Sequence, residues 1–176
     1  MRWVLGVTGL VVALVVVVVA IGYLLPQSHL ASSSARYRAS PEALWASLTD
    51  VAAFPTWRKG LTRVELLPDE NGQRGWREHS GGETITFRVV EADPPRRLVS
   101  RIADQNLPFG GRWIYDLAPV DSGTRLTITE QGEIYNPVFR FVSRFVLGYT
   151  STMEGVLRAL GTKHGETVTP ESVPPS

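Results

Sequence analysis

The stretch "RWIYDLAPVDSGTRLTITEQGE", residues 112–133, decides the fold, because apolar side chains recur at every second position on both sides of a turn. Trp113 and Leu117 fall on one face before the turn "DSG", and Leu126 and Ile128 fall on one face after it. Period-two alternation is typical of strands with one buried face, and a short turn between two such runs indicates an antiparallel hairpin. The stretch therefore predicts two neighbouring strands that share an apolar face.

Further strands are predicted upstream, with turn signals at intervals of roughly 8 to 12 residues. The runs "TRVELLP", "QRGWREH", "TITFRVVE" and "LVSRIAD" are separated by Asn71-Gly72, by "SGGE" and by "ADPPRR". A first strand is expected from Ser33 to Ala39. The spacing predicts a seven-stranded antiparallel sheet.

Helices are predicted on both sides of this meander. Ser40 is a typical N-cap with Pro41 at the first helical position, and "VAAFPTW" can form only a second short piece before Gly60. Asn136 is the expected N-cap of one long C-terminal helix of about seven turns. Its apolar stripe comprises Val138, Phe141, Val142, Phe145, Val146, Tyr149, Met153, Val156, Leu157 and Leu160. A bent sheet wrapped around that helix would bury both apolar surfaces, which is an α+β fold.

The N-terminal run of residues 3–25 contains no charged residue. A helix of that length spans about 34 Å at ~1.5 Å per residue, enough for a hydrocarbon core of about 30 Å. We interpret it as a retained single-pass transmembrane anchor; a signal peptide with a long apolar region is the alternative. Arg2 on one side and Arg36 and Arg38 on the other nearly balance, and the expected orientation leaves the domain extracytoplasmic.

The remaining boundaries follow from composition. Residues 26–32 are predicted to be a linker, residues 33–165 a ligand-binding domain, and residues 166–176, rich in proline and serine, a disordered tail.

Composition excludes several classes of function. The 176 residues carry a net charge of +1, which gives no electrostatic basis for nucleic-acid binding. The absence of cysteine excludes disulfides, thiolate metal sites and cysteine nucleophiles. The three histidines show no ligand spacing, so no metal site is expected. No cofactor is predicted either. The sequence does not specify an oligomeric state.

Several segments, taken in order, point to one superfamily. They are "SPEALWASLTDVAAFPTW", "DPPRRLVSRI", "LPFGGRWIYDLAP" and "GTRLTITEQGEIYNP". Together with the order of strand, two short helices, six strands and long helix, they resemble the START-like, helix-grip superfamily (SRPBCC), in its polyketide cyclase/dehydrase and lipid-transport branch, over about residues 33–165. The resemblance implies a hollow fold with an apolar cavity, between sheet and long helix, for a lipid, sterol, polyketide or similar ligand. Some relatives catalyse cyclisation or dehydration, and many only bind.

Polar residues on apolar strand faces are the candidates for chemistry. Glu130 follows Leu126 and Ile128 at period two, so its carboxylate points inward if that face lines the cavity. There it could orient a ligand or act as a general base; alternatively, a strand end near Gly132 turns it to solvent. His79, beside "SGG" at a hairpin mouth, is the one histidine we expect to be a catalytic candidate.

Large side chains in the expected interior are candidates for the cavity wall, or alternatively for ordinary core packing. They are Trp76, Phe87, Phe109, Trp113, Tyr115, Tyr149 and Met153. Phe109 lies in the connection "DQNLPFGG", where Pro108 restricts the backbone and the glycines permit positive φ. It is predicted either to fold over the cavity entrance as a lid or to cap the core.

Three functions fit these observations. Without a catalytic constellation, the leading hypothesis is a membrane-anchored protein that binds a hydrophobic small molecule and performs no covalent chemistry. The enzyme alternative is an acid/base cyclase or dehydratase acting on a polyketide-like substrate, with Glu130, His79 or a tyrosine transferring protons. The third is an interaction module whose interior is filled by side chains.

Overall fold

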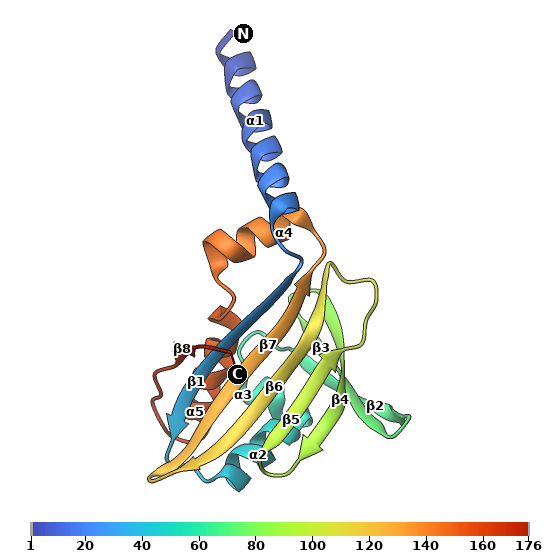
Figure 1. Cartoon of the computed structure of the whole chain (residues 1–176). Coiled ribbons are helices and arrows are strands. Elements are labelled where there is room, and N and C mark those ends of the chain that lie inside the picture. The colour runs from blue at the N-terminus through green and yellow to red at the C-terminus, as the bar shows by residue number, and fades with distance from the viewer. Residues whose placement is uncertain (1, 176) are drawn as a thin grey trace.

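An eight-stranded antiparallel sheet organises the chain, with the strand order β2-β3-β4-β5-β6-β7-β1-β8 (Figure 1). The computed structural model describes residues 2–175. The strands are β1 (Ser28–Tyr37), β2 (Arg63–Glu70), β3 (Gln73–Ser80), β4 (Glu83–Asp93), β5 (Arg97–Ile102), β6 (Phe109–Val120), β7 (Gly123–Ile134) and β8 (Glu171–Val173). The helical pieces are α1 (Arg2–Leu24), α2 (Pro41–Thr49), η1 (Val51–Ala53), α3 (Phe54–Trp57), α4 (Pro137–Val142), η2 (Ser143–Leu147) and α5 (Ser151–Lys163). The predicted α+β helix-grip fold is confirmed.

The hairpin that decides the fold forms as predicted. In β6 and β7, Leu117 pairs with Leu126 and Tyr115 pairs with Ile128. Leu126 and Ile128 are completely buried against α5, where Met153 is also completely buried. The face that packs on α5 is called the inner face below. Alternation of side chains along β6 and β7 therefore fixes which residues face the helix.

The first strand begins earlier than predicted. β1 starts at Ser28 rather than Ser33, because β7 is long enough to pair with the chain as far back as Ser28, which lies opposite Glu133. Most of the predicted linker at residues 26–32 is therefore strand, and Ser32 is nearly fully buried.

The C-terminal tail differs from its predicted disorder. Residues 171–173 form β8, which pairs with β1 at Ser32, Ser33 and Ser34 and brings the strand count from seven to eight. Without β8, β1 would be an open edge strand, and unpaired backbone groups at an edge attract a partner strand. Val168, just before β8, also packs against the core.

The predicted single long helix is broken at Gly148. Before the break lie α4 and the π-helical turn η2, and after it lies α5. Gly148 has φ +75°, a left-handed conformation that glycine adopts without the penalty of a side chain. The predicted N-cap is confirmed: the Asn136 side chain accepts hydrogen bonds from the backbone N–H groups of Val138 and Phe139.

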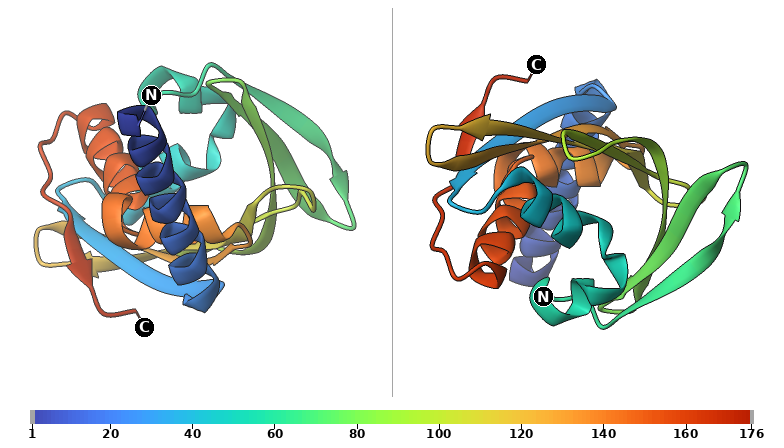
Figure 2. Two further views of the ribbon diagram at one scale, coloured as in Figure 1. Left: turned by 90° about the horizontal axis from the view of Figure 1, so that it is seen from above. Right: turned by 90° about the horizontal axis from the view of Figure 1, so that it is seen from below.

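α1 stands away from the sheet (Figure 1). Its segment Gly6–Leu24 is long and apolar enough to cross a membrane, with a mean hydropathy of 2.8. Its apolar side chains are exposed, including Leu10 at 71 % and Leu14 at 62 %, so it is not a core helix of the domain. Figure 2 shows that the sheet bends, so that β2, β3 and β4 stand apart from α5.

Candidate functional site

The inner face divides into a filled part and a partly exposed part. Where α5 packs on the sheet, Leu126 and Ile128 of β7 and Met153 and Leu157 of α5 are completely buried and leave no surface for a ligand. Beyond α5, strands β4, β5 and β6 present large side chains that are only partly buried. These are Ile85, Phe87, Ile102, Trp113 and Tyr115. Apolar surface that a small domain leaves partly open is where a hydrophobic ligand can bind.

Glu130 lies on the inner face next to His29. It occupies the register position between Ala31 of β1 and Trp113 of β6. The Glu130 Oε1 atom is 3.5 Å from the His29 Nε2 atom, and the two side chains are 23 % and 10 % exposed. The His29 ring stacks on the Tyr149 ring at a centroid distance of 4.1 Å. We call these three residues the Glu130 cluster.

The His29 ring has room because of Gly132, its partner in β7. A Cβ at Gly132 would overlap the imidazole, so a side chain there would displace the ring. The His29 Nδ1 atom is buried without a hydrogen-bond partner in the described part of the chain. A buried polar atom left unpaired costs free energy, which a ligand or a water can recover by hydrogen bonding to it.

A second polar group lies on the inner face of β3. The Glu78 Oε1 atom accepts hydrogen bonds from Arg58 Nη1 at 2.7 Å and from Trp76 Nε1 at 3.0 Å. The Glu78 side chain is 8 % exposed and that of Arg58 is 18 % exposed. We call these three residues the Glu78 cluster. Because its charges are paired, it can remain in a mostly apolar surface.

Tyr115 lies within electrostatic reach of both clusters. Burial raises the pKa of its phenol; Arg58 acts in the opposite direction, and Glu78 and Glu130 raise the pKa further. The phenol therefore stays protonated at neutral pH and can donate a hydrogen bond. A ligand on this part of the inner face would meet apolar rings together with one neutral donor.

A cavity of about 270 Å³ opens where the α2–η1 segment meets the sheet. Trp76, Leu66, Val89 and Leu98 line it from the inner face. Trp76 stacks on Phe87 at a centroid distance of 5.3 Å, so the cavity wall continues into the partly exposed surface. The volume is near the lower limit of typical small-molecule pockets, about 300–1,000 Å³.

Comparison with known proteins agrees with this architecture. The sequence model for polyketide cyclase/dehydrase and lipid transport matches residues 28–165. The chain belongs to the polyketide cyclase/dehydrase and lipid-transport family. The match covers most of the chain and begins where β1 begins. It confirms the resemblance noted from the sequence, and it supports a role in binding or cyclising a hydrophobic ligand.

Solved structures share the fold at low sequence identity. A START superfamily protein from Mycobacterium smegmatis has a TM-score of 0.62 and 17% identity, over 77% of this chain and 96% of that one. The Zhui aromatase/cyclase from Streptomyces sp. R1128 has a TM-score of 0.56 and 18% identity, over 76% of this chain and 88% of the Zhui chain. The di-domain ARO/CYC StfQ of the steffimycin pathway has a TM-score of 0.61 and 13% identity, over 74% of this chain and half of StfQ. No curated protein matches the chain. These likenesses show the fold alone.

In this family member, most of the predicted wall residues lie on the inner face. Trp76 belongs to the Glu78 cluster, Phe87 pairs with it in the neighbouring strand, Trp113 and Tyr115 lie on the same face of β6, and Tyr149 stacks on His29 beside Glu130. Met153 is different, because it lies on α5 and is completely buried in the closed core between α5 and the sheet. The ligand-binding role of each remains a prediction.

Phe109 lies in a strand rather than in a loop. It is the first residue of β6, pairs with Ile134 and is partly buried. Tyr135, just beyond Ile134, donates its backbone N–H to the carbonyl of Pro108, so the connection is tied to the end of β7. Whether Phe109 acts as a lid or as a core cap remains a prediction, tested below.

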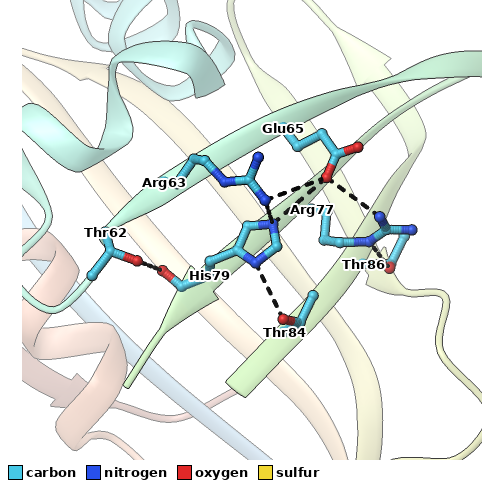
Figure 3. Close-up of polar contacts among 7 residues, drawn as sticks. All are labelled: Thr62, Arg63, Glu65, Arg77, His79, Thr84 and Thr86. Atoms are coloured by element: carbon cyan, nitrogen blue, oxygen red, sulfur yellow. Dashed lines mark hydrogen bonds and ion pairs between the residues drawn. The ribbon is translucent and has the colours of Figure 1, made fainter. Parts of the chain in front are cut away.

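His79 lies on the outer face of β3, opposite the candidate site (Figure 3). Its Nε2 atom is 3.0 Å from Arg63 Nη2 and 3.6 Å from Glu65 Oε2, and its Nδ1 atom is 3.2 Å from Thr84 Oγ1. These partners form a surface network of charges. His79 therefore does not share a site with Glu130.

His29 is the site residue that sequence reasoning missed. Residues 26–32 are predicted to be a linker, and this prediction leaves out the first members of a period-two pattern. The pattern consists of His29, Ala31, Ser33, Ala35 and Tyr37. Extending the period-two pattern back from Tyr37 would have placed His29 on the inner face. Within residues 2–175, no group of three or more histidine, aspartate or glutamate side chains could hold a metal ion.

Proposed function

We propose that this protein binds a hydrophobic small molecule, such as a lipid, isoprenoid or polyketide-like compound, on the open part of the inner face. The single observation that carries the proposal is the partly exposed aromatic and aliphatic surface of β4–β6, bordered by the buried, unpaired Nδ1 atom of His29. Such a surface suits a ligand with a large apolar body and one polar group. Tyr115 and His29 are the groups we assign to the polar end.

We also propose that α1 anchors the protein in a membrane as a single pass. The supporting observation is that the apolar side chains of Gly6–Leu24 are exposed and that only 6% of the stretch is buried. Such a surface is stable in hydrocarbon and costly in water. We place the domain on the extracytoplasmic side; a membrane-impermeant thiol reagent on intact cells carrying Ser122→Cys tests this, because labelling requires that side.

The experiment for ligand binding uses the full chain. Protein purified in detergent is stripped of lipid, incubated with a membrane lipid extract and examined by native mass spectrometry. We expect a retained mass of lipid size. Trp113→Ala, on the inner face, should lose that mass, whereas the neighbouring outer-face variant Arg112→Ala should keep it. A chain that never retains such a mass contradicts the proposal and favours the interaction module.

A second candidate function is acid/base cyclisation or dehydration, favoured by the distance of 3.5 Å between Glu130 and His29. In this role the Glu130 carboxylate would remove a proton next to a substrate carbonyl, and His29 would orient that carboxylate. A synthetic linear poly-β-ketone is the test substrate. The enzyme hypothesis requires turnover that Glu130→Gln abolishes while substrate binding, measured by native mass spectrometry, persists. No turnover by the unmodified chain would reject it.

A further inference from the structure

The segment Pro137–Leu147, which forms α4 and η2, exposes a set of large apolar side chains at the base of α1. Each of them is 40 % exposed or more. They are Val138, Phe139, Phe145, Val146 and Leu147. Soluble monomers rarely leave so many large apolar side chains together in water, and such patches mark contacts with proteins or membranes.

The segment is fixed to the end of α1. Gly22 is buried against the Pro137 backbone, where a Cβ would overlap the carbonyl. Arg140 is 4 % exposed and donates a hydrogen bond from Nη1 to the carbonyl oxygen of Leu25 at 2.8 Å. Figure 1 shows α4 lying across the lower end of α1. The depth of α1 in any membrane therefore also sets the depth of α4.

The charge of this region suits a lipid surface. From Asn136 to Met153 the sequence contains no aspartate or glutamate, and it contains two arginines, Arg140 and Arg144. Arg144 is exposed beside the apolar residues of η2. Helices that lie in the plane of a membrane combine large apolar side chains with basic residues that reach the lipid headgroups.

We infer that Pro137–Leu147 lies in the interfacial layer of the membrane as a second, in-plane contact beside α1. The inference rests on the proposed anchor, because an α1 that spans the bilayer to Leu24 brings α4 to the boundary between hydrocarbon and headgroups. Tyr149 follows this segment and stacks on His29. The contact therefore holds the Glu130 cluster next to the lipid surface.

The test measures the depth of single positions in a bilayer. The chain has no native cysteine, so Phe145→Cys and Leu147→Cys each give one labelling site for the fluorophore NBD. Both side chains are 60 % exposed, so these changes should leave the fold intact. Full-length protein is reconstituted into phosphatidylcholine vesicles containing lipids with a doxyl quencher at carbon 5 or at carbon 12. Leu14→Cys reports the centre of α1, and Ser122→Cys reports the β6–β7 turn at the opposite end of the sheet.

We expect labels at 145 and 147 to be quenched more strongly by the shallow quencher than by the deep one. The label at 14 should show the reverse, and the label at 122 should be quenched by neither. If 14 is quenched but 145 and 147 behave like 122, the in-plane contact is wrong and the anchor stands. If 14 is also unquenched, the anchor fails and the inference fails with it. Unquenched 145 together with disulfide cross-linking of Phe145→Cys between two chains would assign the patch to a second copy and overturn the inference.

Discussion

The half of the sheet beneath α5 and the half that curls away from it differ in what covers the inner face. In the closed half, made of β1, β7 and the end of β6 that carries Leu117, Leu126 and Ile128 are completely buried in a core cluster that includes side chains of α5. In the open half, made of β2 to β5 and the part of β6 that carries Trp113 and Tyr115, Phe87 and Ile102 remain partly exposed, and the charged pair of Arg58 and Glu78 lies among apolar rings.

The length of α5 accounts for this difference. Its 13 residues span about 20 Å at ~1.5 Å per residue, too short to cover a sheet of this width and length. The break at Gly148 diverts the preceding residues to α1 instead. The break at this one glycine thus gives the two parts of the predicted helix different roles. The part after it closes the core, and the part before it contacts the base of α1. Part of the inner face is left open as a result.

The largest expected effect is in the closed half. Leu126→Ala removes a completely buried side chain and should lower the free energy of unfolding by about 4 kcal/mol, within the ~2–5 kcal/mol typical of such truncations. Denaturant unfolding of the full chain in detergent, followed by tryptophan fluorescence, measures this. The native protein should still retain ligand. A loss below about 1 kcal/mol would mean that the closed half is not the stability core.

The next largest effect tests whether the buried Glu78 carboxylate in the open half depends on its ion pair with Arg58. Arg58→Met leaves Glu78 buried without its cation and should cost about 3 kcal/mol, at the low end of the ~3–5 kcal/mol for breaking buried pairs. The double variant Arg58→Met with Glu78→Met should recover most of that loss, because it removes the uncompensated charge. Equal stability of the single and double variants would contradict a paired role. Thermal and denaturant unfolding of the three proteins provide the comparison.

The closed half could be predicted from the sequence and the open half only partly. Alternation in residues 112–133 specified the faces of β6 and β7, since period two needs only neighbouring residues. Glu130 was placed inward by the same rule. The break at Gly148 was hidden because the apolar stripe continues across it, and only packing against α1 reveals which residues leave the helix. The contact between His29 and Glu130 depends on the register of β1 against β7. The patterns within two strands that lie far apart along the chain do not specify this register.

A smaller stability effect with a larger functional effect is expected for Phe87. Because its side chain is partly exposed, Phe87→Ala should cost about 1–2 kcal/mol, less than the ~3–5 kcal/mol for a fully buried phenylalanine. Loss of its stacking on Trp76 should, however, reduce the lipid-sized mass retained in native mass spectrometry. The matched control is Val90→Ala, an exposed outer-face change in the same strand. If both variants retain ligand equally, the open half is not the binding surface.

A substitution of Phe109 tests the border between the two halves at the end of the sheet nearest α1. Its partial burial at the start of β6 favours a cost of about 1 kcal/mol for Phe109→Ala, together with a changed rate of ligand uptake, as a lid requires. A core cap would instead lose ~3–5 kcal/mol and leave the uptake rate unchanged. Unfolding in denaturant and the time course of uptake of a fluorescent fatty acid separate the two alternatives.

The smallest effect is a pH dependence confined to the closed half. At the end of α5, His164 Nε2 lies 3.0 Å from the Ser47 hydroxyl of α2. Burial lowers the pKa of His164 and the positive charge of Lys163 lowers it further, while Glu166 partly offsets the shift.

The unfolded chain, with a histidine pKa near 6.5, then binds more protons than the folded chain, so this contribution to stability is complete above about pH 6.5 and is lost as the pH falls through the lowered pKa. We expect the free energy of unfolding to decrease between about pH 7 and 5.5, and His164→Gln to reduce that decrease, because it removes the titrating group but keeps a polar side chain beside Ser47. If the free energy of unfolding depends on pH in the same way in both proteins, groups other than His164 cause the acid sensitivity, and the prediction for the closed half is wrong.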